Sequence, residues 1–361
     1  MYNHNPSIQG VVDADTAGRT LQLASLNMTL SGQVRATAGQ IYLTSTGISG
    51  TGTLSASGTG AVLLNTSSLT NIALSTSGPG VIATQTGTNN TLAGVTNNAT
   101  LNIANNSTLS VSSTITNNAT ITVNDTAGGN VTRLQPAGGI TLAGTGTIRL
   151  NANLSDVFSA RFEAAGAGTV TYGPGQKITG YGVLYNHTAN IQGTLSPGSG
   201  VANFRDLLLH SMNASLAPTS TVDIELGGTA PGNFDRVTLT NTNLALNGKL
   251  KVTFTGALIQ SGSAWTIITG GNLTGDFTSF DLPDLGFGRE WIITKTANSY
   301  RLLIPCLVAD ITGVGGPPAQ PDGQFTVDDL ITFVNEFIAQ DGCPGPAPCS
   351  PADVTGIGGP P

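Results

Sequence analysis

The sequence of this 361-residue chain is poor in charged and aromatic residues. Charged residues make up 9% of the chain and aromatic residues 5%. No basic stripe is present that could neutralise phosphates, so we expect no nucleic-acid partner. No apolar run reaches the length of a membrane span, so we expect no transmembrane segment. The chain is nevertheless 39% hydrophobic, which is too apolar for a disordered protein.

Recognisable catalytic arrangements are also missing from the sequence. His4, His187 and His210 have no neighbouring carboxylate or cysteine in the sequence, and we interpret them as surface or turn residues. Cleavage of a polysaccharide would need a cluster of carboxylates on one face, but the few acids of residues 1–200 show no spacing that suggests a pair. No Gly-x-Ser-x-Gly or Cys–His arrangement occurs. We therefore predict that the protein is not an enzyme and has no catalytic residues.

Net charge and cysteine are concentrated in the last 56 residues. All 13 Lys and Arg lie in residues 1–305 beside 13 Asp and Glu, whereas residues 306–361 hold the other seven acids and no base. An acidic segment of this kind favours a cation as partner. Cys306, Cys343 and Cys349 lie in the same segment, where a disulfide with one thiol left over suits an oxidising compartment. The spacing leaves the pairing open.

The N-terminus lacks the basic and apolar segments of a signal peptide. The rest of the chain is typical of a secreted protein. We therefore expect an extracellular or cell-surface location and a natural start upstream of Met1.

The clearest positive signal is an internal repeat. The sequence TNNATLNI at 96–103 returns twenty residues later as TNNATITV at 116–123. Apolar residues two apart, bracketed by Asn pairs, are typical of one coil of a β-solenoid. Alternate side chains of a strand point to opposite faces, so we expect Leu101 and Ile103 to be buried and Asn102 to face water.

Two further patterns fit such coils. Gly-x-Gly triplets recur within 48–54, 142–148 and 178–184, and glycine is favoured where a coil turns a tight corner at positive φ. A phosphate-binding loop is a poor interpretation, because the glycines do not form G-x-G-x-x-G and no helix follows. Asn98 and Asn118 stand in N-x-S/T triplets that could accept glycans, but we favour turn asparagines that hydrogen-bond the backbone and one another.

We divide the body into solenoid coils at 1–200 and a region at 201–304 that forms either wider coils or a cap over the open sheet edge. The sequence IQGTLSPG at 191–198, with the strand-like stretches after it, resembles the autotransporter-associated β-strand repeats of bacterial secreted and surface proteins. This resemblance covers residues 90–304. It implies an all-β fold, a right-handed parallel β-helix, that serves as a stalk or passenger rather than as an enzyme.

The acidic segment contains a candidate calcium loop. An EF-hand-type loop places oxygen ligands at positions 1, 3, 5, 7 and 12, with Gly at 6 and an apolar residue at 8. The residues at the ligand positions are Asp310, Thr312, Asp322, Gln324 (through its carbonyl) and Asp329. Extra residues within 313–321 interrupt the loop, so we expect weak Ca²⁺ binding, with a Kd of about 10⁻⁴–10⁻³ M. The alternative is an acidic, Pro/Gly-rich linker that leads into a helix N-terminus.

A helix should follow this loop at 326–338, because Thr326 and Asp329 form a capping box before an apolar face. The loop and helix together, 305–342, resemble one half of a dockerin repeat. This resemblance implies a small calcium-loop-plus-helix module that anchors a secreted protein to a cohesin-like or cell-surface partner. Residues 343–361 form a Pro/Gly-rich linker and the start of a second repeat, since CLVADITGVGGPP at 306–318 returns as CSPADVTGIGGPP at 349–361. This second repeat looks truncated at Pro361.

Three hypotheses follow. The leading one is a secreted or cell-surface structural β-solenoid, displayed or anchored through a calcium-binding dockerin-like tail. The second is a carbohydrate-binding or polysaccharide-degrading component, with glycans as ligands. The third is an adhesin passenger.

Overall fold

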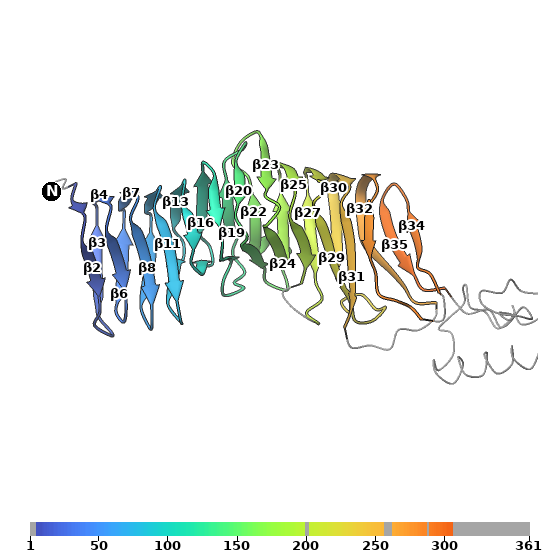
Figure 1. Ribbon diagram of the computed structural model, residues 1–361, viewed down its shortest axis with the longest axis horizontal. Helices are drawn as coiled ribbons and strands as arrows, with labels where there is room; N and C mark the ends of the chain where they lie inside the picture. Colours follow the sequence, from blue (N-terminus) through green and yellow to red (C-terminus); the bar gives the residue numbers. More distant parts are fainter. Residues whose placement is uncertain (1–4, 199–201, 256–261, 287–288, 306–361) are drawn as a thin grey trace, which may run out of the picture.

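The structure, a computed structural model, describes residues 5–198, 202–255, 262–286 and 289–305. Within these ranges the chain consists of strands and turns, with one short 3-10 helix, η1 (Val157–Ser159). The strands stack along the long axis of a rod-shaped body (Figure 1). No helix in this part of the chain is long and apolar enough to cross a membrane.

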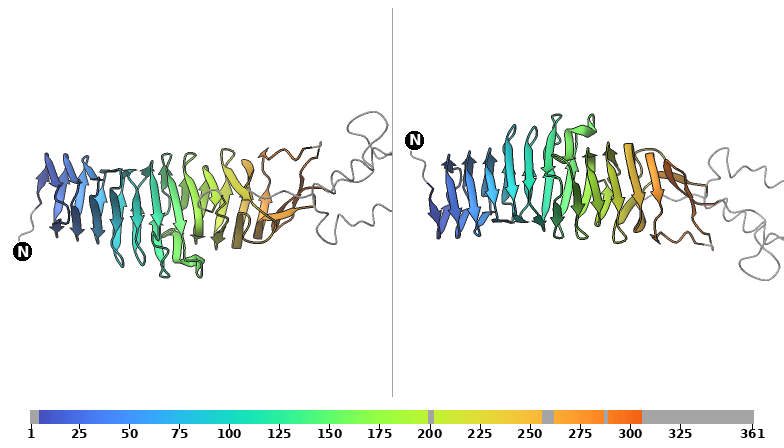
Figure 2. Two further views of the ribbon diagram at one scale, coloured as in Figure 1. Left: turned by 90° about the horizontal axis from the view of Figure 1, so that it is seen from below. Right: turned by 90° about the horizontal axis from the view of Figure 1, so that it is seen from above.

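Each strand of the N-terminal half pairs in parallel with the strand three positions further along the chain: β1 with β4, β2 with β5 and β3 with β6. Three strands therefore make one coil, and successive coils stack in register (Figure 2). This architecture is a parallel β-solenoid, as the repeat predicts.

The strands of the first half are β1 (Ser7–Ile8), β2 (Val11–Ala14), β3 (Thr20–Ala24), β4 (Asn27–Leu30), β5 (Gln33–Ala36), β6 (Gln40–Thr44), β7 (Gly47–Gly50), β8 (Thr53–Ser57), β9 (Ala61–Asn65), β10 (Ser68–Thr70), β11 (Ala73–Ser77), β12 (Val81–Thr84), β13 (Asn89–Ala93), β14 (Thr96–Asn98), β15 (Leu101–Ile103), β16 (Thr108–Ser112), β17 (Ile115–Asn117) and β18 (Thr120–Val123). Those of the second half are β19 (Thr132–Pro136), β20 (Thr141–Ala143), β21 (Thr147–Asn151), β22 (Ala160–Glu163), β23 (Thr169–Tyr172), β24 (Lys177–Tyr185), β25 (Thr188–Ile191), β26 (Thr194–Pro197), β27 (Asp206–His210), β28 (Asn213–Leu216), β29 (Thr221–Leu226), β30 (Arg236–Leu246), β31 (Lys249–Phe254), β32 (Ala264–Gly275), β33 (Ser279–Asp281), β34 (Ile292–Lys295) and β35 (Ser299–Leu303).

The twenty-residue repeat sets the register of the coils that contain it. Leu101 lies beside Ile121, and Ile103 lies beside Val123, in the pair β15 and β18. Leu101 and Ile103 are fully buried, whereas Asn102 between them is partly exposed. The predicted inward and outward faces of this coil are confirmed. Each such buried Leu or Ile contributes roughly 1.5–3 kcal/mol, which a single isolated coil could not obtain.

Glycine marks the corners, as the triplets predict. Gly50, Gly144 and Gly180 have φ values of 131°, 92° and 104°, which side chains rarely adopt. The second glycine of a triplet is needed for another reason, because neighbouring coils approach closely. A Cβ added to Gly146 would lie 2.3 Å from the carbonyl oxygen of Ala119.

The turn asparagines also behave as expected, since the Asn118 side-chain amide donates a hydrogen bond of 2.9 Å to Asn98 Oδ1 one coil away.

Parallel pairing continues through the second half as far as β33, which pairs with β31. The strands β24, β30 and β32 are longer than the others. β24 and β30 each follow the coil across a corner and pair with two strands on the same side, and β32 pairs with β30 on both sides of a break in register. At the C-terminal end of the described body, β35 pairs antiparallel with β32 and with β34. Trp265 and Tyr300 are buried between these strands and the last coils.

Candidate functional site

The predicted calcium ligands lie outside the described residues. They are Asp310, Thr312, Asp322, Gln324 and Asp329. The same holds for the expected helix at 326–338 and for the three cysteines, so the calcium loop stays a prediction. Over the described ranges, no group of three or more His, Cys, Asp or Glu side chains could hold a metal ion.

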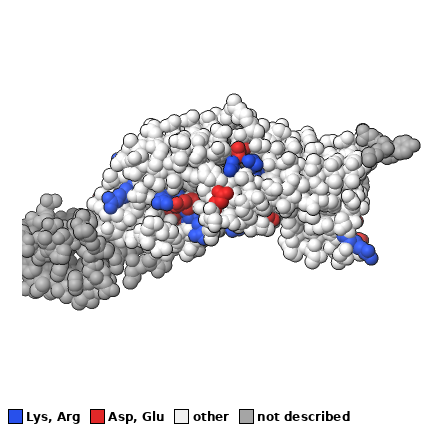
Figure 3. Space-filling view, turned by 180° about the vertical axis from the view of Figure 1, so that it is seen from behind, with Lys and Arg blue, Asp and Glu red and all other residues white. Residues whose placement is uncertain are grey.

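The face of the solenoid drawn in Figure 3 carries few charged side chains. One outward column shows this clearly on strands β4, β7, β10, β13 and β16, where the residues in register are Asn27, Gly47, Ser68, Thr91 and Ser110. On the later strands β22, β24, β27 and β30, the residues in register are Glu163, Tyr185, His210 and Thr240. Bulky functional groups therefore replace small ones over a few coils.

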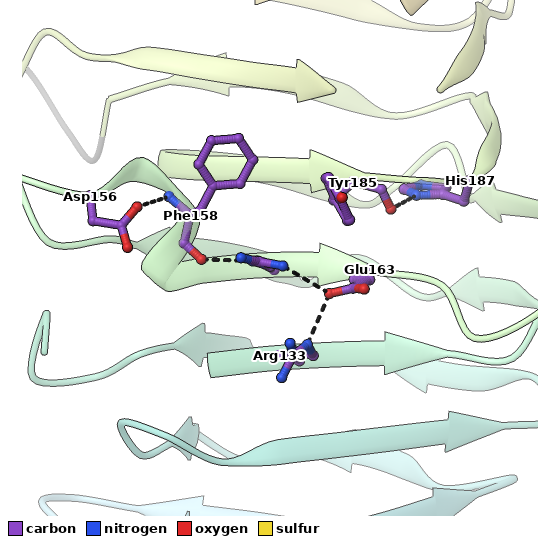
Figure 4. Close-up of polar contacts among 7 residues, drawn as sticks. Arg133, Asp156, Phe158, Glu163, Tyr185 and His187 are labelled. Atoms are coloured by element: carbon purple, nitrogen blue, oxygen red, sulfur yellow. Dashed lines mark hydrogen bonds and ion pairs between the residues drawn. The ribbon is translucent and has the colours of Figure 1, made fainter. Parts of the chain in front are cut away.

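These groups form a surface cluster, which we call the aromatic–arginine cluster. Its members are Arg133, Phe158, Arg161, Glu163, Tyr185 and His210, and most of them are drawn in Figure 4. Phe158 comes from the loop that holds η1. The others come from the outward face of four strands that lie side by side in the sheet, β19, β22, β24 and β27.

The loop between β21 and β22 carries Phe158 onto this face. Asp156 caps η1 by accepting a hydrogen bond from the Phe158 backbone N–H at 2.9 Å. The buried Ser159 hydroxyl accepts a hydrogen bond of 2.7 Å from the Asn153 backbone N–H and donates one of 2.8 Å to the Asp156 carbonyl. The Asn153 side-chain amide donates to the Ala127 carbonyl of the preceding coil at 2.9 Å. The Asn124 side-chain amide of the body donates to Ser159 Oγ at 3.5 Å, so the loop is held to the body on both sides of Asp156.

Packing of this loop buries apolar residues on the outer face of the solenoid. Val183 and Leu208 lie side by side in register, on the same face as Arg161. They are 0% and 9% exposed although they point away from the main core. Because η1 packs against β24, a second, smaller apolar contact forms outside the solenoid wall.

The rings of the cluster contact one another, Phe158 edge to face and the other two at a tilt. The Phe158 ring meets Tyr185 at 6.1 Å and 86°, and His210 at 5.3 Å and 78°. Tyr185 and His210 are register partners, and their rings lie 5.2 Å apart with a tilt of 34°. Such aromatic contacts are each worth about 0.5–1.5 kcal/mol beyond the burial of area.

Arg161 links the rings to the charged end of the cluster. Its guanidinium carbon lies 5.4 Å from the Phe158 ring centre and 5.2 Å from that of Tyr185, which is within cation–π range. Its Nε donates to the Phe158 carbonyl at 2.8 Å. Glu163 Oε2 accepts a hydrogen bond from Arg133 Nε at 2.9 Å and lies 3.6 Å from Arg161 Nη1. One carboxylate thus serves two arginines on adjacent strands.

His187 supports the cluster from inside. It lies in the turn after β24, as predicted, but its ring is turned inward and is buried. Nδ1 lies 2.9 Å from the Tyr185 carbonyl, and Nε2 lies 2.8 Å from the Tyr172 hydroxyl. Burial lowers the pKa of His187, which favours the neutral imidazole. Its Nδ1–H then donates a hydrogen bond to the Tyr185 carbonyl, and Nε2 accepts one from the Tyr172 hydroxyl. These two hydrogen bonds, from Tyr172 through His187 to the Tyr185 carbonyl, hold the backbone of Tyr185 in place.

A buried carboxyl group, that of Asp235, lies just before β30, the strand that pairs with β27 of the cluster. Asp235 is 1% exposed and accepts hydrogen bonds of 3.1 Å from the backbone N–H groups of Arg205 and Glu225. Burial raises its pKa to about 8, against the opposing effect of these two backbone donors. Both carboxylate oxygens are used by the main chain, so Asp235 ties two segments together.

The aromatic–arginine cluster was missed by sequence reasoning. Phe158, Arg161, Glu163 and Tyr185 form a local concentration of bulky residues in a chain poor in them, which is a usable signal. The spacing between register partners changes from coil to coil here, so the sequence alone could not show that they share one face with His210.

Comparison with known protein families and with curated proteins finds no match to this chain.

Proposed function

We propose that this protein is a secreted or cell-surface structural rod, in which the β-solenoid provides length and the acidic tail provides attachment. The observation that carries the proposal is the in-register parallel pairing that runs from β1 to β33. A stack of this kind pairs nearly all of its backbone groups, which limits the access of proteases to extended chain. Its surface of small polar side chains suits a spacer or display element.

The finer features belong to the same proposal. The coil is right-handed, because parallel connections within one sheet almost always are. The body is related to the autotransporter-associated β-strand repeats, on the sequence resemblance at 191–198. The tail is dockerin-like and binds one Ca²⁺ through Asp310, Thr312, Asp322, the Gln324 carbonyl and Asp329. Calcium would order the helix at 326–338 and create the surface for a cohesin-like partner.

Two measurements on the full chain test this proposal. Digestion with a broad-specificity protease should leave a resistant fragment that spans the described body, and rapid fragmentation throughout residues 5–305 would contradict the rod. Calorimetric titration with calcium chloride should give heat in the parent chain and none in Asp322→Ala. An absence of heat in the parent chain would end the calcium assignment, and an unchanged titration in Asp322→Ala would reject the ligand set.

An adhesin passenger would use the same rod but would bind a cell or matrix along its side. The aromatic–arginine cluster supports this second candidate, because it presents partly exposed aromatic and charged side chains on the side of the rod.

A further inference from the structure

We propose that the aromatic–arginine cluster is a binding site for a neutral saccharide chain, with a pyranose unit seated against Tyr185 and His210. This inference goes beyond the structural role proposed above and does not depend on the calcium-binding tail.

The cluster is ordered before any ligand arrives. The Tyr185 backbone is held by His187, the Arg161 guanidinium is held by the Phe158 carbonyl, and Glu163 lies between its two arginines. Binding to such a surface loses little side-chain entropy, because the rotamers are already fixed. A surface that only needed to be soluble would not require this degree of order.

The charge of the cluster argues against a phosphate backbone as ligand. Arg133 and Arg161 share Glu163, and the adjoining loop adds the acid Asp156, so two bases stand against two acids in this region. A site without net positive charge releases few counterions and gains little from nucleic acid or another polyanion.

The burial pattern argues against an apolar protein segment as ligand. Val183 and Leu208, aliphatic residues of this face, are already buried, and η1 of the loop that carries Phe158 packs against β24. Among the described residues, these two side chains therefore offer no exposed aliphatic groove to the apolar stripe of a helix.

The groups that remain accessible suit a sugar. Tyr185 and His210 are partly exposed, and within the described residues no protein group bonds to the Tyr185 hydroxyl or to His210 Nε2. The next residue in this column is the small, exposed Thr240, so the cluster is open on the side of β30. A pyranose ring has an apolar C–H face that packs on aromatic rings and hydroxyls that both donate and accept hydrogen bonds. Phenol, imidazole, guanidinium and carboxylate groups supply the matching partners.

The direction of the chain follows from the register. Arg133, Arg161, Tyr185 and His210 lie on successive strands about 4.8 Å apart along the solenoid axis. A saccharide chain would therefore run along the axis. Because Arg161 and His210 already contact the Tyr185 ring, one sugar residue would pack on His210 at the side open toward β30 and beside the Tyr185 hydroxyl, and the next would lie toward the arginines.

Native affinity electrophoresis of the full chain tests the proposal, since a net charge of −7 carries it into the gel. The probes are hydroxyethylcellulose, xylan, galactomannan and dextran, each cast into a separate gel, with polygalacturonate as the acidic comparison. At least one neutral polymer should retard the parent chain, and Tyr185→Ala should need at least about tenfold more polymer for the same retardation. Arg133→Gln should weaken retardation as well, without disturbing Phe158 or Val183.

Matched controls separate the site from general effects. Phe280→Ala removes an aromatic side chain that is 46% exposed on β33, and Arg35→Gln removes an ion-paired arginine on β5. Both controls should migrate like the parent chain in every gel. If Tyr185→Ala fails to fold, as judged by its circular dichroism spectrum, Arg133→Gln against Arg35→Gln decides the question.

Three outcomes would overturn the proposal. One is the absence of retardation by all four neutral polymers. Another is equal retardation of the parent chain and both cluster variants. The third is retardation by polygalacturonate alone that disappears in salt, which would indicate simple ion exchange.

Discussion

Replacing Gln176 by alanine should loosen the solenoid locally, because a buried polar ladder crosses its interior at this residue. The Asn97 side-chain amide donates to Asn117 Oδ1 at 2.8 Å, and Asn117 Nδ2 donates to Gln176 Oε1 at 3.1 Å. Gln176 Nε2 donates in turn to the carbonyls of Asn117 and Ala143, at 2.8 and 2.9 Å. Asn97, Asn117 and Gln176 are all fully buried or nearly so.

The ladder skips a coil, which makes Gln176 indispensable to it. Gly144 and Gly146 stand between Asn117 and Gln176, and neither has a side chain that could take part. A Cβ on Gly146 would lie 2.5 Å from Asn117 Nδ2. The absence of a side chain at this position therefore leaves room for the hydrogen bond between Asn117 and Gln176.

The cost of Gln176→Ala can be worked out from these contacts. Three hydrogen bonds are lost, each worth about 0.5–1.5 kcal/mol net. The buried Asn117 amide is left unsatisfied, at about 1–3 kcal/mol, and the partly buried Ala143 carbonyl loses one partner. The three lost bonds alone give about 1.5–4.5 kcal/mol, and the unsatisfied Asn117 amide raises the lower end of this range, so we expect a local destabilisation of about 2–5 kcal/mol. The matched control is Gln33→Ala, whose side chain is exposed and which should change stability by less than about 0.5 kcal/mol.

Native-state amide hydrogen exchange is the suitable assay, because each coil contacts only its neighbours and global unfolding need not be two-state. Protection at β17, β20 and β24 should fall in Gln176→Ala, while β4 and β5 keep the protection of the parent chain. Exchange at β17 and β20 that is unchanged from the parent chain would refute the reasoning. Equal loss of protection along the whole rod would refute its local character.

Three other changes follow from the structure. Burial lowers the pKa of His187, so below the ordinary pKa of histidine this residue binds a proton more readily in the unfolded chain than in the folded one. The thermal midpoint should therefore fall as pH drops from about 7 to about 5, and it should fall less in His187→Phe. For Asp235 the pH dependence has the opposite sign, because its pKa is raised on folding to about 8. Its contribution to stability is therefore lost as pH rises from about 4 to 8. The difference in thermal midpoint between the parent chain and Asp235→Asn, measured across this range, should show the loss. Trp265→Phe removes the 2.7 Å hydrogen bond from Nε1 to the Gly228 carbonyl and should lower the free energy of unfolding of the last coils by about 1–3 kcal/mol, measured by urea denaturation.

The sequence predicts the coils well where the repeat is regular. Twenty residues separate Thr96 from Thr116 and Leu101 from Ile121, and these are the register partners in the structure. The reason is physical, because one face of each strand is buried and a slip by one residue would expose its apolar set. Glycine corners are equally readable, since the positive φ of Gly50 and Gly144 leaves little choice of residue.

The candidate site could not be predicted in the same way. Phe158 reaches the cluster through a loop insertion that interrupts the coil, and no periodicity specifies where such a loop folds. His187 illustrates the same limit, because its burial depends on the Tyr172 hydroxyl from another strand. The ladder from Asn117 to Gln176 joins residues two coils apart, a distance that only the stacked structure defines.

The in-register stacking of parallel coils can be tested most directly by cysteine cross-linking. In a chain whose native cysteines are replaced by serine, Asn102→Cys and Thr122→Cys would occupy partly exposed register partners on β15 and β18. Their Cα atoms would lie about 4.8 Å apart, within the range of a disulfide. The control pair, Asn102→Cys with Arg149→Cys, spans two coils and exceeds that range. Mild oxidation followed by peptide mass spectrometry should find a disulfide between positions 102 and 122 and none between 102 and 149; the reverse pattern, or no bond in either pair, would contradict the solenoid.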